Sequence, residues 1–319
     1  DADGICSLVQ LRLSNPKNSK LITGVKRDIS LLKKISPVKQ DSVTVLDISM
    51  KKNYQEVVDF LELGVEIFYA DHHQSGDLLT HENFRSHINE SSNICTSLII
   101  NKYLSGKYQE WAIVGAYGDG MDKSARIIAN KADLSKDDRT QLRLLGECIN
   151  YNSYGTSEMD LLYHPSLLYK LLKRNYNPFD FISNEAGVYN KLLDSYCSDI
   201  SKAKAISPEI ENDNVSIVIL PDEPWSRRVI GVYANLLMHG DKNRAHALMI
   251  LNKNRSYLVG VRAPYNNKCG ADILCSMFGG GGRRGAAGIN NLPKQDKNNF
   301  IKEFKKQFST NKVMPEFRC

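Results

Sequence analysis

The sequence predicts an α/β fold in which a parallel sheet is flanked by helices and a smaller α/β domain follows. Two observations carry this prediction. In the N-terminal third, apolar runs rich in β-branched side chains, at residues 21–25, 43–47 and 65–70, are typical of buried strands. Residues 54–63 have the spacing of an amphipathic helix. Strands that alternate with helices in this way form parallel sheets covered on both faces.

The length of 319 residues predicts two domains with an active-site cleft between them, because one domain usually holds about 100 to 200 residues. Residues 93–183 are mainly helical in pattern and complete a catalytic domain over 1–183. A polar helical stretch and breakers from Pro208 onward predict a helical linker over 184–213. The remainder, 214–319, is expected to bind substrate. Its strands are expected at 215–220, 245–251 and 257–262, and its helices at 229–238, 271–278 and 297–308.

The composition predicts a cytoplasmic protein that is not embedded in a membrane. Hydrophobic residues make up 42% and charged residues 24%, and no apolar run approaches the roughly 20 residues that cross a bilayer. The seven cysteines are odd in number and scattered, which indicates neither a disulfide framework nor a zinc knuckle. A net charge of +6 is compatible with a polyanionic partner but fits an ordinary solvated surface equally well.

Acidic and histidine side chains stand at positions typical of a metal site. Asp1 and Asp3 are one residue apart, so in an extended segment both carboxylates project to the same side, and Gly4 then permits a turn into a helix. By itself this motif also fits a solvated acidic loop.

Further candidates follow the predicted strands. Asp47 ends one strand run, and Asp71, His72 and His73 follow another. Asp119 lies between glycines in the segment GAYGDG. Ligands of open α/β sheets gather at the carboxyl ends of the strands, and carboxylates with imidazoles suit a divalent ion such as Mn²⁺. Each acid taken singly could merely cap a helix, whereas their joint placement favours a metal centre.

In their order and spacing, DADGICS, the isolated Asp47, ADHH and the Asp119 segment resemble the four metal-binding motifs of the DHH-superfamily phosphoesterases. The resemblance continues into the second domain. There FGGGGRRGAAG is similar to the GGGH signature of the DHH-associated domain, and PWSRRVIGVYA is similar to a segment of RecJ-type exonucleases. Arg283 stands where that signature has histidine.

The resemblance implies a role for each matching residue. Two divalent ions, Mn²⁺ in preference to Mg²⁺, would be held by Asp1, Asp3, Asp47, His72 and Asp119, with Asp47 bridging the two. His73 would face the scissile phosphate, with Asp71 supporting the histidines from behind. Substrate would be bound by Arg262, Gly280, Gly281, Gly282 and Arg283, where glycine amides and an arginine fork can hold a phosphate.

The resemblance also implies a function, namely a two-metal phosphodiesterase that hydrolyses short single-stranded oligonucleotides or linear dinucleotides, as nanoRNases do. Only a short segment follows the glycine motif, which favours short substrates over long DNA. Three alternatives stay open: a RecJ-like exonuclease for single-stranded DNA, a cyclic-dinucleotide phosphodiesterase, and a catalytically inactive relative that binds nucleic acid. A polyphosphate hydrolase is disfavoured by the glycine segment. The preference for RNA or DNA, and the choice between monomer and homodimer, also stay open.

Overall fold

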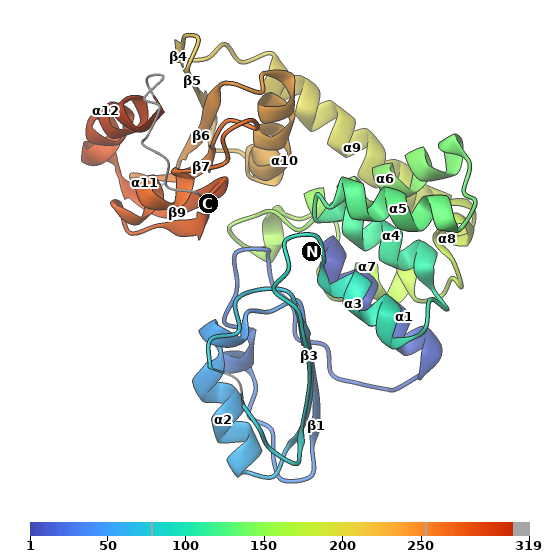
Figure 1. Cartoon of the computed structure of the whole chain (residues 1–319). Helices are drawn as coiled ribbons and strands as arrows, with labels where there is room; N and C mark the ends of the chain where they lie inside the picture. The colour runs from blue at the N-terminus through green and yellow to red at the C-terminus, as the bar shows by residue number, and fades with distance from the viewer. Residues whose placement is uncertain (78, 253, 309–319) are drawn as a thin grey trace. The chain divides into compact units, whose positions relative to one another are not determined.

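The chain divides into two compact units, Asp1–Tyr196 and Cys197–Cys319 (Figure 1). The computed structural model describes residues 1–77, 79–252 and 254–308. The division falls inside the long helix α9 (Ala186–Lys204), which lies within the connection expected over 184–213.

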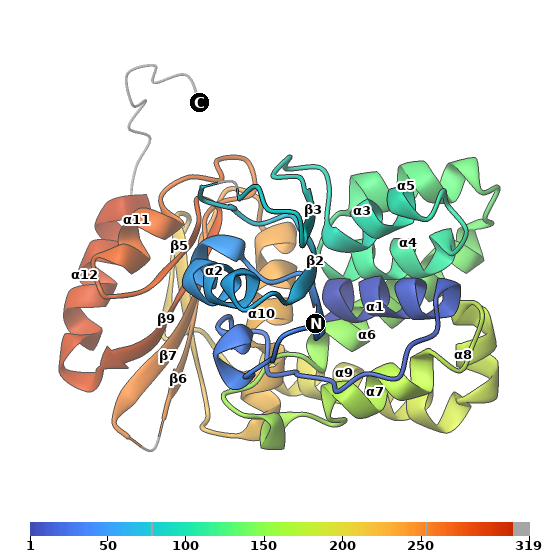
Figure 2. The same ribbon diagram turned by 90° about the horizontal axis from the view of Figure 1, so that it is seen from below.

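The first unit contains a parallel three-stranded sheet in the order β1-β2-β3. Its strands are β1 (Ser42–Leu46), β2 (Glu66–Asp71) and β3 (Phe84–Ile88). Helix α2 (Tyr54–Glu62) packs on one face through a core that includes Val57 and Phe60. On the other face, Ile99 and Ile100 of α3 (Thr96–Tyr103) and Leu11 of α1 (Ala2–Ser14) form a second apolar cluster. These layers confirm the predicted parallel sheet covered by helices (Figure 2).

The strand expected at residues 21–25 is not formed, and that prediction is wrong. These residues lie in an irregular segment before the short 3-10 helix η1 (Leu31–Lys34). The backbone amide of Lys26 donates to the carbonyl of Ser153, 2.8 Å away, so the segment is held against the end of a helix. A short apolar run can bury its side chains in a loop as well as in a strand. The sheet's third strand is instead β3, an edge strand whose exposed polar residues hid it from a pattern search.

Helices dominate the rest of the first unit, which confirms the expectation for 93–183. After α3 come α4 (Gln109–Gly118), α5 (Asp122–Lys131), α6 (Lys136–Tyr151), α7 (Pro165–Leu172) and α8 (Pro178–Asn184). Besides η1, the first unit contains the short 3-10 helices η2 (Met50–Lys52) and η3 (Glu158–Asp160).

A glycine contact lets α1, α4 and α6 approach one another closely. A Cβ atom added to Gly118 would lie 2.3 Å from the Cβ of Ala2 in α1 and 2.8 Å from the carbonyl oxygen of Gly146 in α6. Gly118 is the last residue of α4, and the chain turns at Gly120, whose φ is +75°. This packing brings the end of α4, and with it Asp119, to the start of α1.

Gly118→Ala is expected to destabilise the protein by about 1 to 3 kcal/mol, because the added methyl group overpacks a contact between helix backbones. The measurement is the free energy of unfolding in urea. Gly187→Ala is the matched control, since Gly187 is also helical but has open space around its Cα. The control should gain about 0.5 to 1 kcal/mol from helix propensity. Equal effects of the two substitutions would contradict this role of Gly118.

The second unit is built on a six-stranded mixed sheet in the order β4-β5-β6-β7-β9-β8. Among the strands of the described residues, only β5 (Val215–Leu220) and β6 (Ala245–Leu251) pair in parallel, and the crossover helix α10 (Pro224–Gly240) joins them. The other strands are β4 (Ile210–Glu211), β7 (Ser256–Arg262), β8 (Gly281–Arg283) and β9 (Ala286–Pro293).

Helices cover both faces of this second sheet as well. One face packs on α11 (Ala271–Ser276) and α12 (Lys297–Phe308) around Phe300 and Phe304, and η4 (Lys294–Asp296) precedes α12. The other face meets α10, where Gly260 of β7 lies against Ile230. The predicted smaller α/β domain is thereby confirmed, although β8 and β9 were not foreseen. No helix in the described part of the chain is long and apolar enough to span a membrane.

Candidate metal centre

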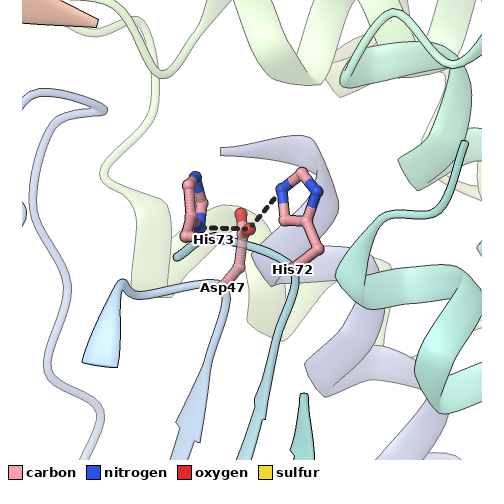
Figure 3. A group of neighbouring side chains, drawn as sticks. All are labelled: Asp47, His72 and His73. Carbon is pink, nitrogen blue, oxygen red and sulfur yellow. Dashed lines mark ion pairs between the residues drawn. The ribbon is translucent and has the colours of Figure 1, made fainter. Parts of the chain in front are cut away.

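The first unit gathers acidic and histidine side chains at the carboxyl edge of its sheet. Asp47 directly follows β1, and Asp71 ends β2, with His72 and His73 next in the chain. Since β1 and β2 are parallel neighbours, these residues meet at one edge. Figure 3 shows both imidazole rings directed toward the Asp47 carboxylate. His72 Nε2 lies 3.5 Å and His73 Nδ1 lies 3.9 Å from Asp47 Oδ1.

Helix α1 brings the first acidic motif to the same place, but in a different conformation from the one expected. The helix begins at Ala2, so residues 1–3 are not extended, and the prediction of an extended segment is wrong. Asp1 caps the helix by accepting hydrogen bonds from the amides of Asp3 and Gly4. Aspartate is among the best residues at this capping position, and its preference for a helix start prevails here over an extended strand end.

Asp3 is fully buried, and its side chain is held by the N-terminus of another helix. Its two carboxylate oxygens accept hydrogen bonds from the backbone amides of Thr96 and Ser97, each at 2.7 Å. These are the first amides of α3, which lack partners within the helix and carry its positive dipole end. The orientation of the Asp3 side chain is thereby fixed.

Asp47 occupies a left-handed backbone conformation with φ of 60°, uncommon for a residue other than glycine. Its Oδ1 accepts a hydrogen bond from the Thr96 hydroxyl at 3.2 Å. A Cβ atom on Gly4 would lie 3.3 Å from the Asp47 Cβ. Gly4 thus serves to let α1 approach Asp47, and the turn expected of it is absent, because it lies inside the helix.

His72 is buried and oriented so that one ring nitrogen faces the acids. Its Nδ1 lies 3.1 Å from the carbonyl oxygen of Ile94, to which it donates, so that Nε2 presents a lone pair. That Nε2 lies 3.5 Å from Asp47, 3.6 Å from Asp119 and 3.9 Å from Asp3. The Oδ2 atom of Asp119 is buried and accepts no hydrogen bond from the described residues. The carboxylates of Asp3, Asp47 and Asp119 therefore all lie within 4 Å of the His72 Nε2 atom.

The negative charges of this cluster are crowded, so a bound cation would stabilise it. Burial, together with the charges of Asp3, Asp119 and Asp71, raises the pKa of Asp47 well above its ordinary value. Two overlapping groups have ligand atoms close enough to hold a metal ion: Asp3, His72 and Asp119, and Asp47, His72 and His73. Carboxylates and imidazoles fit a divalent ion such as Mn²⁺ or Mg²⁺, whose charge would offset the crowding of the acids.

His73 is the exposed member of the cluster. Its side chain is 37% exposed, and its Nδ1 lies 2.7 Å from Oδ1 of the fully buried Asp71. The other oxygen of Asp71 is buried without a hydrogen bond from the described residues. Asp71 therefore contacts the His73 ring directly, and its supporting role stays a prediction.

Asp1 stands apart from both groups because it is paired with Lys26, a residue that the sequence did not single out. Lys26 Nζ lies 2.6 Å from Asp1 Oδ2 and 3.8 Å from Asp119 Oδ1. Burial alone would lower the pKa of Lys26, but Tyr154 and the carboxylates of Asp119, Asp47 and Asp3 outweigh it and raise that pKa. No motif marks Lys26, since its position depends on contacts distant in sequence.

The residues expected to bind substrate lie in the second unit. Arg262 is held against α10, where its Nε donates to the side chain of Asn235 at 2.6 Å and its Nη2 to the carbonyl of Gly231 at 3.2 Å. Arg283 is exposed on β8, the edge strand of the sheet.

The glycine run has a packing role that differs from the predicted one. The Gly280 amide donates to the carbonyl of Cys275 at 2.9 Å, so the expectation of a free phosphate-binding amide is wrong at this position. Added Cβ atoms would lie 2.3 Å from the Gly288 carbonyl oxygen at Gly280 and 2.5 Å from the Ala287 Cα at Gly282. Gly281 has open space there and lies on β8. Glycine at 280 and 282 thus permits the tight pairing of β8 with β9.

Comparisons with known proteins agree with this architecture. No protein-family model and no curated protein matches the chain. Among solved structures, the pGpG-specific phosphodiesterase PggH from Vibrio cholerae matches with a TM-score of 0.58 and 13% identity, over 97% of this chain and 96% of that one. The DHH domain of a protein described as a member of a ribosomal protein family matches with a TM-score of 0.53 and 13% identity, over 83% of this chain and 68% of that one.

A third structure, an exopolyphosphatase-related protein from Bacteroides fragilis, matches with a TM-score of 0.51 and 15% identity, over 97% of this chain and 88% of that one. At such identities the matches establish the fold. The chain therefore shares the fold of these structures, one of which is described as a DHH domain, as the order and spacing of its four acidic motifs predict.

Proposed function

We propose that the chain is a phosphodiesterase that depends on two divalent ions, with Mn²⁺ preferred to Mg²⁺, and that hydrolyses short single-stranded oligonucleotides or linear dinucleotides. One observation carries the proposal: Asp3, Asp47 and Asp119 converge on the Nε2 lone pair of the buried His72. Buried polar atoms are usually hydrogen-bonded, whereas Asp119 Oδ2 is buried here without a hydrogen-bond partner among the described residues.

The protein's own residues divide the work between them. Bound divalent ions supply a nucleophile from water and neutralise charge on the phosphate. Asp1, Asp3, Asp47, His72 and Asp119 would hold them, and the exposed His73 would face the substrate phosphate. Asp71 keeps the ring of His73 in place through the 2.7 Å contact. A fixed orientation matters because a displaced donor loses most of its effect on the reaction.

Short nucleotides are the proposed substrates. The fold matches a phosphodiesterase described as specific for pGpG along nearly the whole of both chains, which supports a dinucleotide-sized substrate. The match to an exopolyphosphatase-related protein makes polyphosphate a necessary comparison substrate. A catalytically inactive relative is disfavoured, because the ligand residues of all four motifs are present.

Digestion of 5′-labelled RNA and DNA from 2 to 30 nucleotides with Mn²⁺, resolved to single nucleotides, tests this proposal. Dinucleotides to pentanucleotides are expected to be cleaved with a higher kcat/KM than a 30-nucleotide strand, because contacts near one terminal phosphate supply most of the binding. Faster processive degradation of the long strand would support the RecJ-like alternative. Hydrolysis of cyclic dinucleotides or polyphosphate, without cleavage of linear nucleotides, would contradict the proposed substrate.

Arg283→Ala is expected to raise KM for a dinucleotide about 10-fold while kcat changes little. An exposed arginine contributes near the lower end of the range for a charge-assisted hydrogen bond. A contact with a part of the substrate that does not react stabilises ground and transition states alike. Steady-state kinetics on one dinucleotide measure both constants. Arg255→Ala, at an exposed arginine of the same unit, is the control. Unchanged kinetics of Arg283→Ala would show that substrate is held elsewhere.

A further inference from the structure

We propose that Lys26 is a positioning residue that serves as a fixed cation on the Asp1 side of the metal centre, so that the two divalent ions bind with unequal affinity. The inference deepens the proposed function and rests on it, since the centre must bind divalent ions. The side around His72 would fill first, and the side of Asp1 would fill only at higher metal concentration.

The Asp1 carboxylate is already fully engaged by groups of the protein. Its Oδ1 accepts from the amides of Asp3 and Gly4 at 3.1 and 3.3 Å, and its Oδ2 pairs with Lys26 Nζ at 2.6 Å. The Asp1 side chain is 11% exposed, so water competes little with this pair. A metal ion on this side must therefore displace or accommodate an ammonium group that already neutralises the ligand.

Helix α6 and the residues after it fix Lys26 independently of the acids. Its backbone amide donates to the Ser153 carbonyl at 2.8 Å, and its Nζ donates to the Asn150 side chain at 2.9 Å. The aromatic ring of Tyr154 lies 5.5 Å from the same Nζ. The ammonium group is thus built into the first unit and does not depend on the acids alone for its position.

The two carboxylate oxygens of Asp119 face different surroundings on the Asp1 side and on the His72 side of the centre. Its Oδ1 faces Lys26 at 3.8 Å, whereas its Oδ2 faces His72 Nε2 at 3.6 Å and accepts no hydrogen bond from the described residues. The His72 side therefore offers free lone pairs from several ligands, while the Asp1 side offers a carboxylate that an ammonium group already holds. Two positive charges close together repel, so the ion nearest Lys26 binds more weakly.

Calorimetric titration of the full, metal-stripped chain with Mn²⁺ alone tests this inference. In the wild type, the second binding step is expected to be weaker than the first by about 10- to 150-fold, the range for a charge-assisted hydrogen bond that must be broken. Lys26→Gln keeps a hydrogen-bonding side chain and Lys26→Met keeps the length, but both lose the charge. Both variants are expected to bind the second ion at least about 10-fold more tightly than the wild type does.

Two controls separate charge from structure. Lys26→Arg retains the charge and should retain the unequal steps, and Lys33→Met, at an exposed lysine paired with Glu56, should leave both steps unchanged. Lys26→Met is also expected to melt at a lower temperature than the wild type in EDTA and to regain most of the difference with Mn²⁺, because the ion then replaces the lost charge. Lys26→Gln tests the inference through the binding steps even where Lys26→Met fails to fold.

The outcomes distinguish this inference from the proposed function. Two equally tight steps in the wild type, or an unchanged gap in both uncharged variants, would overturn the role of Lys26 while leaving a metal-dependent phosphodiesterase intact. Absence of any Mn²⁺ binding by the wild type would contradict the proposed function and this inference with it. Two Mn²⁺ binding steps of unequal affinity in the wild type that become nearly equal in the uncharged variants support the inference, whether or not a tested nucleotide is cleaved.

Discussion

Replacing Asp47 by alanine is expected to lower kcat/KM for a dinucleotide by at least about 10³-fold, comparable to the loss of a major electrostatic stabiliser of the transition state. Asp47 Oδ1 lies 3.5 Å from His72 Nε2 and 3.9 Å from His73 Nδ1, and in the proposed centre it would serve both ions. Its removal therefore disrupts the whole site. Steady-state kinetics with saturating Mn²⁺ measure the effect, and Asp59→Ala, at an exposed acid on α2, is the control.

The stability of a second variant, Asp47→Asn, distinguishes a lost charge from a damaged fold. The pKa of Asp47 is raised in the folded state, so its ionisation lowers stability as pH rises above the pKa that it has in the unfolded chain, and without metal at neutral pH this carboxylate opposes folding. Asparagine tolerates the left-handed backbone of this position, so in EDTA at pH 7 Asp47→Asn should unfold at a urea concentration no lower than the wild type does. Turnover by Asp47→Ala like that of the wild type in Mn²⁺ would contradict the proposed centre, and marked destabilisation of Asp47→Asn in EDTA would contradict the electrostatic argument.

Asp71→Ala is expected to lower kcat by about 10- to 100-fold, the usual effect of removing a group that orients a residue of a metal site. Asp71 is fully buried and contacts His73 at 2.7 Å. Asp71→Asn keeps an acceptor for the His73 ring but removes the charge, so it should retain more activity than the alanine variant. The measurement is kcat for both variants on one dinucleotide.

Mn²⁺ affinity serves as the check on this second prediction. Because Asp71 belongs to neither group of candidate ligands, affinity should change much less than kcat. If both variants bind Mn²⁺ and turn over as the wild type does, Asp71 has no part in orienting His73. If they lose metal as completely as Asp47→Ala, Asp71 is itself a ligand.

The residues at the strand ends were predictable because two separate signals agree there. The apolar runs of β1 and β2 mark buried parallel strands, and parallel strands bring their carboxyl ends to one edge. Asp47, Asp71, His72 and His73 follow from that rule. The position of Asp119 depended on α4, whose close packing through Gly118 and Gly146 brings the end of that helix to the start of α1.

Other features depended on contacts that leave no local pattern. Residues 21–25 are apolar enough for a strand, yet the segment is held by the Ser153 carbonyl at the end of α6, more than a hundred residues away in sequence. Lys26 enters the centre through the same contact. The glycine run shows another limit: glycine suits both a phosphate loop and close backbone packing, and a sequence does not distinguish the two.

Turnover of a linear dinucleotide by metal-stripped protein, before and after Mn²⁺ is restored, tests the central claim most directly. The convergence of Asp3, Asp47 and Asp119 on His72 predicts no measurable hydrolysis in EDTA and full recovery when Mn²⁺ is added back. Asp47→Ala should stay inactive in both conditions. Hydrolysis that continues undiminished after the metal is removed, or no hydrolysis of any linear dinucleotide with Mn²⁺ bound, would contradict it.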